Sequence, residues 1–226
     1  MRIRFTNRAE AGKMLAKSLS NHAGSPGLLV LALPRGGVPV AYEVARALKA
    51  PLDVFVVRKL GVPDNPELAM GAIASGGVRV LNESVVTMLG LSPLVIDEVA
   101  RRELKEVERR EITYRNHRPP LSIRGRTVIV IDDGIATGST MRAAIEALSQ
   151  LNPARLIVAT PTVAWSTAEE LRAEVDEFCA LITPENFNSV GEWYVEFPQT
   201  SDEEVCALLE KAHTALMRTA HSPRGH

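Results

Sequence analysis

Four β-branched residues in succession, Val128 to Ile131, place the strongest constraint on how this chain folds. Because the run has no polar alternation, it is typical of a strand buried on both faces of a parallel sheet. Other apolar runs, at 28–33, 52–57, 155–160 and 178–182, alternate with helical patterns. This alternation predicts an α/β fold with an open, mostly parallel sheet flanked by helices.

The buried run leads directly into two carboxylates and a glycine-containing turn, which is followed by a helical pattern at 141–151. A helix N-terminus with short hydroxyl side chains suits a phosphate monoester, whereas the carboxylates suit ribose hydroxyls or a hydrated divalent cation. Many doubly wound proteins have a similar turn and bind nothing there. The residues of this predicted anion site are Asp132, Asp133, Gly134, Ile135, Ala136, Thr137, Gly138, Ser139 and Thr140.

The nonapeptide 132–140 resembles the phosphoribosyl diphosphate (PRPP) signature of the type I phosphoribosyltransferases. It has the hydrophobic strand, two acidic residues, two variable residues and then a short Ala-Thr-Gly-Ser-Thr loop. A Walker-type nucleotide loop is the nearest rival, but it requires a lysine where Gly138 stands. The resemblance covers about residues 28–197 and implies a Rossmann-like sheet with a small hood over its crevice.

A second glycine turn, Pro34-Arg35-Gly36-Gly37, follows the run at 28–33. In the family that it resembles, this loop binds pyrophosphate and often has an unusual peptide geometry, so Arg35, Gly36 and Gly37 are candidates for that role. The alternative interpretation is that the two glycines only turn the chain and that Arg35 faces solvent.

Two adjacent cations, Arg58 and Lys59, follow the run at 52–57. At the carboxyl end of a parallel strand they would face the ligand crevice, although a solvated surface pair is the alternative. They resemble the Arg-Lys-x-Gly segment of adenine phosphoribosyltransferases, which implies contact with pyrophosphate. The stretch 67–74 then resembles the start of the family's mobile hairpin, where Glu67 is a candidate ligand for a base nitrogen.

A long helix with charges of both signs is predicted at 94–116 and has no counterpart in the smallest members of the family. Such a pattern usually marks a solvated helix stabilised by weak ion pairs. The alternative is that its end forms a cationic lid over the site. That lid would contain Arg109, Arg110, Tyr114, Arg115, His117 and Arg118.

We expect a single domain over 1–226, with a core at about 28–182 and a hood formed by the N-terminal segment and about 183–200. The loop after the last strand binds the acceptor in the family, so Phe187, Trp193 and Tyr194 are candidates there. They could equally pack the hood against the sheet. A terminal helix is predicted at 201–216, followed by a disordered polar tail.

The formal net charge of −1 gives no general attraction to nucleic acid or to an anionic membrane, so small-molecule partners are expected. Neither of the two cysteines, Cys179 and Cys206, belongs to a metal-binding or redox motif. No signal peptide and no membrane-spanning run is recognisable. We therefore expect a cytoplasmic protein, and the family resemblance implies a homodimer.

The resemblance implies Mg²⁺-dependent transfer of the 5-phosphoribosyl group from PRPP to a nitrogenous acceptor, with release of pyrophosphate. Asp132, Asp133, Arg58 and Lys59 would be catalytic, and the two aspartates would bind the metal. Ala136 replaces the aspartate of the 6-oxopurine enzymes, which disfavours hypoxanthine and guanine and leaves the acceptor open. The alternatives are a PRPP- or nucleotide-sensing protein without turnover, and a hydrolase.

Overall fold

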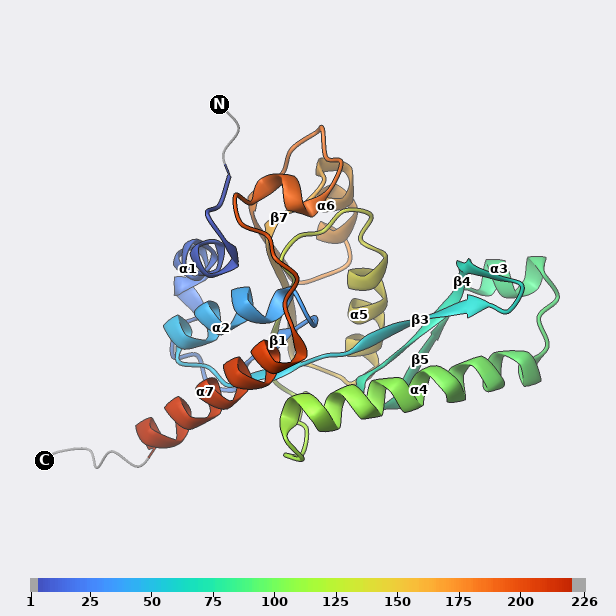
Figure 1. Cartoon of the computed structure of the whole chain (residues 1–226), viewed down its shortest axis with the longest axis horizontal. Helices are drawn as coiled ribbons and strands as arrows, with labels where there is room; N and C mark the ends of the chain where they lie inside the picture. The colour runs from blue at the N-terminus through green and yellow to red at the C-terminus, as the bar shows by residue number, and fades with distance from the viewer. Residues whose placement is uncertain (1–3, 221–226) are drawn as a thin grey trace, which may run out of the picture.

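The computed structural model describes residues 4–220 and has a five-stranded parallel sheet at its centre (Figure 1). The strand order β2-β1-β6-β7-β8 confirms the α/β fold predicted from the sequence. Strand β1 runs in register with β6, from Leu28 opposite Thr127 to Ala32 opposite Ile131, so the carboxyl ends of the two strands are neighbours. The strands are β1 (Leu28–Ala32), β2 (Leu52–Val54), β6 (Thr127–Ile131), β7 (Arg155–Thr162) and β8 (Glu177–Ile182).

Helices cover both faces of this sheet, which explains why its strands lack polar alternation. Side chains such as Val30 and Ile129 pack on the face that carries α1, α2 and α7, whereas Leu31 and Val130 face α5 and α6. These helices are α1 (Arg8–Ser18), α2 (Gly37–Leu48), α5 (Ser139–Gln150), α6 (Trp165–Arg172) and α7 (Asp202–Ala220).

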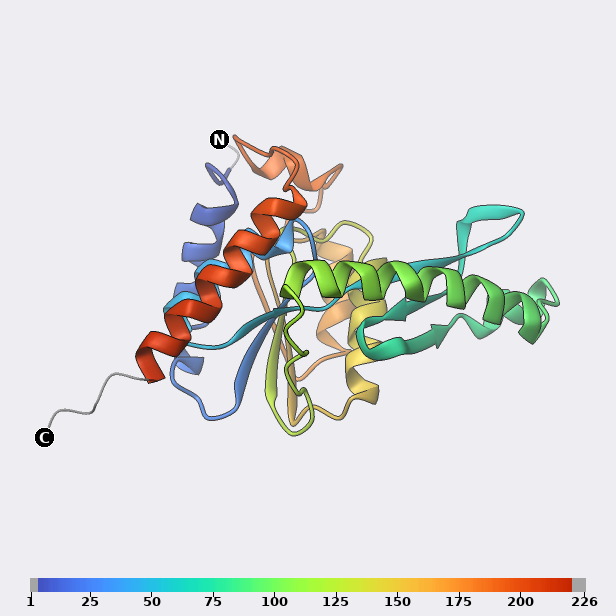
Figure 2. The same ribbon diagram turned by 60° about the horizontal axis from the view of Figure 1, so that its bottom comes forward.

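A second, antiparallel sheet and a long helix project from the central sheet (Figures 1 and 2). We call this region, residues 57–115, the arm. The helix predicted at 94–116 is confirmed as α4, and the predicted hairpin is confirmed as β3 and β4. The elements of the arm are β3 (Val57–Val62), β4 (Asn65–Ala74), β5 (Val78–Leu81), α3 (Glu83–Met88) and α4 (Pro93–Arg115).

The predicted strand 52–57 is wrong in its extent. The parallel strand β2 ends at Val54, and Val57 begins the antiparallel strand β3. Arg58 and Lys59 therefore lie inside the arm and not at the carboxyl end of the central sheet. The apolar run could not reveal this break, because the intervening Phe55 and Val56 are buried as completely as strand residues.

The start of the chain and the segment after β8 pack together as a small aromatic cluster. Phe5 and Tyr194 form an isolated bridge between parallel segments, and the amide of Phe5 donates to the carbonyl of Trp193. We call residues 4–7 and 187–198 the hood. A short 3₁₀ helix, η3 (Val190–Trp193), lies within it, and two others occur at η1 (Ser20–His22) and η2 (Ser75–Gly77).

Helix α7 begins as predicted, with the Ser201 hydroxyl accepting from the Glu204 amide, but it runs to Ala220 instead of ending at 216. The disordered tail predicted beyond it falls largely outside the described residues. Among residues 4–220, no helix has both the length and the apolar character that a membrane span requires.

Candidate functional site

The two glycine loops predicted to bind anions lie in contact at the carboxyl ends of β1 and β6. A Cβ atom built on Gly36 would lie 2.1 Å from Oδ2 of Asp133, and one on Gly37 would lie 2.7 Å from the carbonyl oxygen of Ile131. The loop that contains Asp133 lies so close to Gly36 and Gly37 that neither position has room for a side chain. The peptide bond between Pro34 and Arg35 is cis, in keeping with the unusual geometry expected of this loop.

The loop from Ala136 to Thr140 is held in place from behind, and its hydroxyl groups remain exposed. The Thr167 hydroxyl donates to the carbonyl of Ala136 (2.7 Å), and Arg142 donates to the carbonyl of Thr137 (2.9 Å). Gly138 caps the start of α5. Its φ of +76° is in the left-handed region, which glycine adopts more easily than other residues. The exposed side chains of the loop are Thr137, Ser139 and Thr140.

The acid pair that precedes this loop is an electrostatically costly arrangement. Burial and the neighbouring Asp133 carboxylate raise the pKa of Asp132 well above its ordinary value. Burial also raises the pKa of Asp133, and the Arg8 guanidinium opposes part of that rise. A bound cation, or hydrogen-bond donors on a ligand, would stabilise the charged forms of the two carboxylates. Carboxylates with shifted pKa values of this kind are common at functional sites.

Two residues hold Asp133 from the hood side, in roles that the sequence did not reveal. Arg8 donates from Nε to Oδ2 of Asp133 at 2.7 Å, and the Tyr194 hydroxyl donates to the main-chain carbonyl of Asp133 at 2.6 Å. Arg8 lies 125 residues away in sequence and looks like any exposed helical cation, so no sequence signal identifies it. The sequence predicts Tyr194 at the site, but as a ligand for the acceptor.

The two cations that are adjacent in sequence, Arg58 and Lys59, line one cavity of about 400 Å³, but each pairs with a different acid. Lys59 also lines a cavity of about 350 Å³ together with Ser139 and Thr140 at the start of α5. Arg58 makes an ion pair with Glu103 of α4 (2.7 Å). Lys59 also lies 3.4 Å from Glu67, whose side chain is 94% exposed.

The Arg35 side chain does not lie free in solvent but faces the start of α7. Its Nη1 atom is 3.6 Å from Oδ1 of Asp202, and the same carboxylate oxygen accepts a hydrogen bond from the Tyr114 hydroxyl (2.7 Å). About a third of the Arg35 side chain remains exposed, so a bound anion can still reach it.

The aromatic residues proposed for the acceptor are largely used in packing the hood. Trp193 and Tyr194 are buried, and Phe187 stacks on Trp193 with ring centroids 6.0 Å apart. The structure thus brings these residues together with Phe5 in one cluster. Their role toward an acceptor stays a prediction.

The predicted cationic lid at the end of α4 is wrong for its central residues. Tyr114 is buried, and Arg115 is consumed by a buried ion pair with Asp53 (2.8 Å) and a second pair with Glu111. Arg109 and Arg110 pair with Glu106 on the same helix. This end of α4 anchors the arm to the edge strand β2 through Arg115, and its Tyr114 contacts Asp202 beside Arg35.

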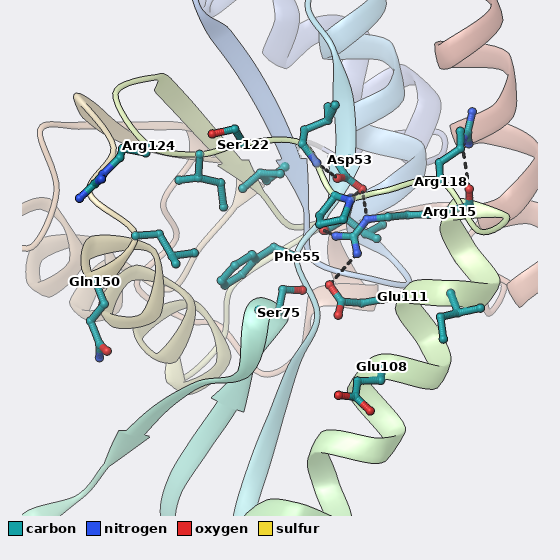
Figure 3. Close-up of a pocket in the computed structure, with 18 of the residues that line it drawn as sticks. Asp53, Phe55, Ser75, Glu108, Glu111, Arg115, Arg118, Ser122, Arg124 and Gln150 are labelled. Carbon is teal, nitrogen blue, oxygen red and sulfur yellow. Dashed lines mark hydrogen bonds and ion pairs between the residues drawn. The ribbon is translucent and has the colours of Figure 1, made fainter.

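Figure 3 shows a separate cavity of about 760 Å³ beside this anchor, with Asp53, Glu111 and Arg115 in its wall. Its floor includes Phe55, and its polar wall groups include the Ser75 hydroxyl (Figure 3). None of its lining residues comes from either anion loop. On its wall Arg115 pairs with Asp53 and Glu111, and the cavity is separate from the two anion loops.

The donor set at the acid pair is compatible with the Mg²⁺ ion that the family resemblance implies. Mg²⁺ in proteins is commonly bound by one or two carboxylates together with substrate phosphates. Asp132 and Asp133 provide such carboxylates, with Asp133 already paired to Arg8. Within residues 4–220 no group of three or more acidic, histidine or cysteine side chains forms a metal cage, so such an ion would need ligands from the substrate as well.

Comparison with known proteins places this geometry in a family. The phosphoribosyl transferase domain family matches residues 5–196. Two Mycobacterium tuberculosis proteins, provisionally named phosphoribosyl transferases Rv0571c (strain H37Rv) and MT0597 (strain CDC 1551), are each 46% identical over 209 residues. These matches cover 92% of this chain and 47% of theirs, so the chain spans about half the length of these curated relatives.

The crystal structure of TT1426 from Thermus thermophilus superimposes with a TM-score of 0.82 at 40% identity, covering 92% of this chain and 99% of that chain. The segment matched by the family includes all five strands of the central sheet and both anion loops. The chain therefore belongs to the phosphoribosyltransferase family and has its type I fold.

Proposed function

We propose that this protein transfers the 5-phosphoribosyl group of PRPP to a nitrogenous base or related acceptor and releases pyrophosphate, with Mg²⁺ as the metal. The observation that carries the proposal is the contact between the acid pair and the Arg35–Gly37 loop, beside the hydroxyl-bearing start of α5. These three features match, in order, the ribose, the diphosphate and the 5-phosphate of PRPP. Membership of the family supports the assignment.

The 5-phosphate would bind at the start of α5. Thr137, Ser139 and Thr140 expose their side chains there, and the helix dipole favours an anion at this end. Arg142 and Thr167 hold the loop carbonyls, and the exposed Thr137 and Ser139 hydroxyls, 3.2 Å apart, would turn from each other toward the phosphate. Little rearrangement of the loop is needed for binding.

The ribose would bind over Asp132 and Asp133. Loss of pyrophosphate from the anomeric carbon produces a transition state that resembles an oxocarbenium ion, and carboxylates close to the sugar stabilise that positive charge. The acid pair is costly when the site is empty, so its interaction with a developing cation is correspondingly favourable.

The leaving pyrophosphate would meet Arg35, the main chain of Gly36 and Gly37, and Lys59. Lys59 is held only by an exposed contact to Glu67, which is weak, so a polyanion can recruit it readily. Arg58 would first have to leave Glu103. Mg²⁺, when bound with the diphosphate, would neutralise its charge and assist its departure.

The acceptor nitrogen would attack the anomeric carbon from the face opposite pyrophosphate, with inversion and without a covalent intermediate. The hood and the arm lie on two sides of the site and would exclude water from the reacting centre. Ala136 offers no carboxylate to a purine ring, so we expect an acceptor other than hypoxanthine or guanine. The candidates for acceptor contacts are Phe187, Trp193, Tyr194 and Glu67. We also propose that the protein is a homodimer located in the cytoplasm.

The test is pyrophosphate release from PRPP and Mg²⁺ in the presence of purine, pyrimidine and other nitrogen acceptors. Release that depends on one acceptor, and that is lost in Asp132→Asn and Asp133→Asn, supports the transferase. Both substitutions keep the size and shape of the side chain and remove its charge, and circular dichroism checks that each variant is folded.

Calorimetry with PRPP separates the alternatives. Binding of PRPP without release for any acceptor would favour a sensing protein, and release without any acceptor would favour a hydrolase. Failure of PRPP to bind at millimolar concentration would contradict the proposal.

A further inference from the structure

Arg8 occupies a position that local helix energetics disfavour. It is the first residue of α1, directly after the Asn7 cap, where the helix dipole favours an acid over a cation. Its side chain is nevertheless only 11% exposed. A cation buried at the wrong end of a helix requires a compensating interaction elsewhere in the fold.

That compensation comes from three groups that meet the guanidinium on different sides. Nε donates to Oδ2 of Asp133 (2.7 Å), and Nη1 donates to the carbonyl of Pro198 (2.6 Å). The planar group also lies over the ring of Phe197, 3.8 Å from its centroid. Lysine, a point charge without a planar face, cannot reproduce this set of contacts.

These contacts close a ring of interactions between the hood and the acid pair. The Phe197 ring, which contacts Arg8, also stacks on Tyr194, with centroids 4.9 Å apart. Tyr194 in turn holds the carbonyl of Asp133, whose carboxylate is bound by Arg8. The hood cannot shift relative to the central sheet without moving Asp133.

The same carboxylate also limits the pyrophosphate loop, since Oδ2 of Asp133 lies against Gly36. Arg8 thus fixes the Asp133 carboxylate, which lies against the Arg35–Gly37 loop, while Tyr194 of the hood holds the main chain of the same residue. It also neutralises one of two adjacent acids, so a polyanion approaching the site meets less negative charge.

We propose that Arg8 is a positioning residue for phosphoribosyl transfer: it holds Asp133 in the orientation that binds the ribose of PRPP and couples that orientation to the hood. This inference rests on the proposed function. It predicts that loss of Arg8 weakens PRPP binding and slows turnover beyond any effect on folding.

The experiment compares Arg8→Gln and Arg8→Lys with the parent protein in PRPP calorimetry and in steady-state pyrophosphate release. Arg8→Gln should weaken PRPP binding and lower kcat, each by about tenfold or more. Arg8→Lys keeps the positive charge and should bind PRPP nearly as well as the parent. Its kcat should stay low, because lysine cannot make both the hydrogen bond to Pro198 and the stacking contact with Phe197. Arg46→Gln, which removes an exposed arginine paired with Glu43 on α2, is the matched control.

A double-mutant cycle with Asp133→Asn tests the mechanism of the effect. If Arg8 acts through Asp133, adding Arg8→Gln to Asp133→Asn should weaken PRPP binding little further. The inference is overturned if PRPP binding and kcat of Arg8→Gln, per folded molecule by circular dichroism, stay within twofold of the parent. It also fails if the two substitutions are additive.

Failure of the inference and failure of the proposed function give different results. If the parent protein turns over PRPP and the Arg8→Gln variant has the same kinetics, only the role proposed for Arg8 is contradicted. Absence of PRPP binding in the parent protein removes the function together with the inference.

Discussion

The hood and the arm flank the same site but are held by interactions of different kinds. On the hood side, Arg8 and Tyr194 reach Asp133 through short, largely buried hydrogen bonds. On the arm side, the cations Arg58 and Lys59 make partly exposed ion pairs within the arm itself. Buried charged hydrogen bonds are strong and specific, whereas exposed ion pairs contribute little.

We call the hood side the fixed wall, because its contacts to Asp133 are short and largely buried. We call the arm side the recruitable wall, because its cations are held by weak contacts. On the hood side, Arg8 and Tyr194 set the position of Asp133 through contacts within the chain. The arm side keeps cations on weak contacts, so a polyanion can draw them in. Each of the following predictions tests one half of this comparison.

The largest effect is expected on the fixed wall from Gly36→Ala. The added Cβ would lie 2.1 Å from Oδ2 of Asp133, which must then move and lose its geometry with Arg8. Because misplacement of a catalytic group by about 1 Å can cost about 100-fold, we expect kcat/KM for PRPP to fall by about that factor.

Gly125→Ala is the matched control for Gly36→Ala, because Gly125 has open space at its Cβ position. Its positive φ makes alanine destabilising by about 1–2 kcal/mol, without an effect on turnover. Equal kcat/KM values for the two variants would show that close packing against Asp133 is unimportant.

Tyr194→Phe should lower stability by about 1–2 kcal/mol, because it leaves the buried carbonyl of Asp133 without its 2.6 Å donor. Chemical denaturation followed by circular dichroism measures this change. A loss below about 0.3 kcal/mol would mean that the hood is not held through this hydrogen bond. Tyr42→Phe, at a partly buried tyrosine of α2 that packs against the core, is the matched control.

Asp132→Asn should stabilise the ligand-free protein at pH 7 while abolishing turnover. The pKa of Asp132 is raised in the folded state, so its ionisation opposes folding. This penalty is fully present above the raised pKa and disappears as the pH falls below the ordinary value of 3.8. Thermal melts of variant and parent should therefore differ at pH 7 and converge in acid; a lower Tm for the variant at pH 7 would contradict the assignment.

The smallest effect on stability is expected on the recruitable wall. Lys59→Ala removes only an exposed contact to Glu67, so the free energy of unfolding should change by less than about 0.5 kcal/mol. Pyrophosphate release should nevertheless slow, since Lys59 faces the cavity shared with Ser139 and Thr140. Lys105→Ala, at an exposed lysine of α4 in the same arm, is the matched control and should retain turnover. A large loss of stability in Lys59→Ala would place the arm with the fixed wall.

Local sequence was sufficient where one segment carries both the structure and the chemistry. The β-branched run 128–131 predicted a parallel strand, and the following nonapeptide predicted the turn and the start of a helix, because strand, turn and helix cap are set by neighbouring residues. The hydrophobic run and the charges of α4 likewise predicted its length to within one residue at each end.

Tertiary structure decided the contacts between segments that are distant in sequence. The pairing of Arg8 with Asp133, the burial of Arg115 against Asp53 and the different acidic partners of Arg58 and Lys59 all depend on how elements pack. A charged side chain looks the same in sequence whether solvent or a buried partner surrounds it. The sequence alone therefore determined the fold class and the signature loop, whereas packing determined which charges belong to the site, because burial and pairing arise only when separate segments meet.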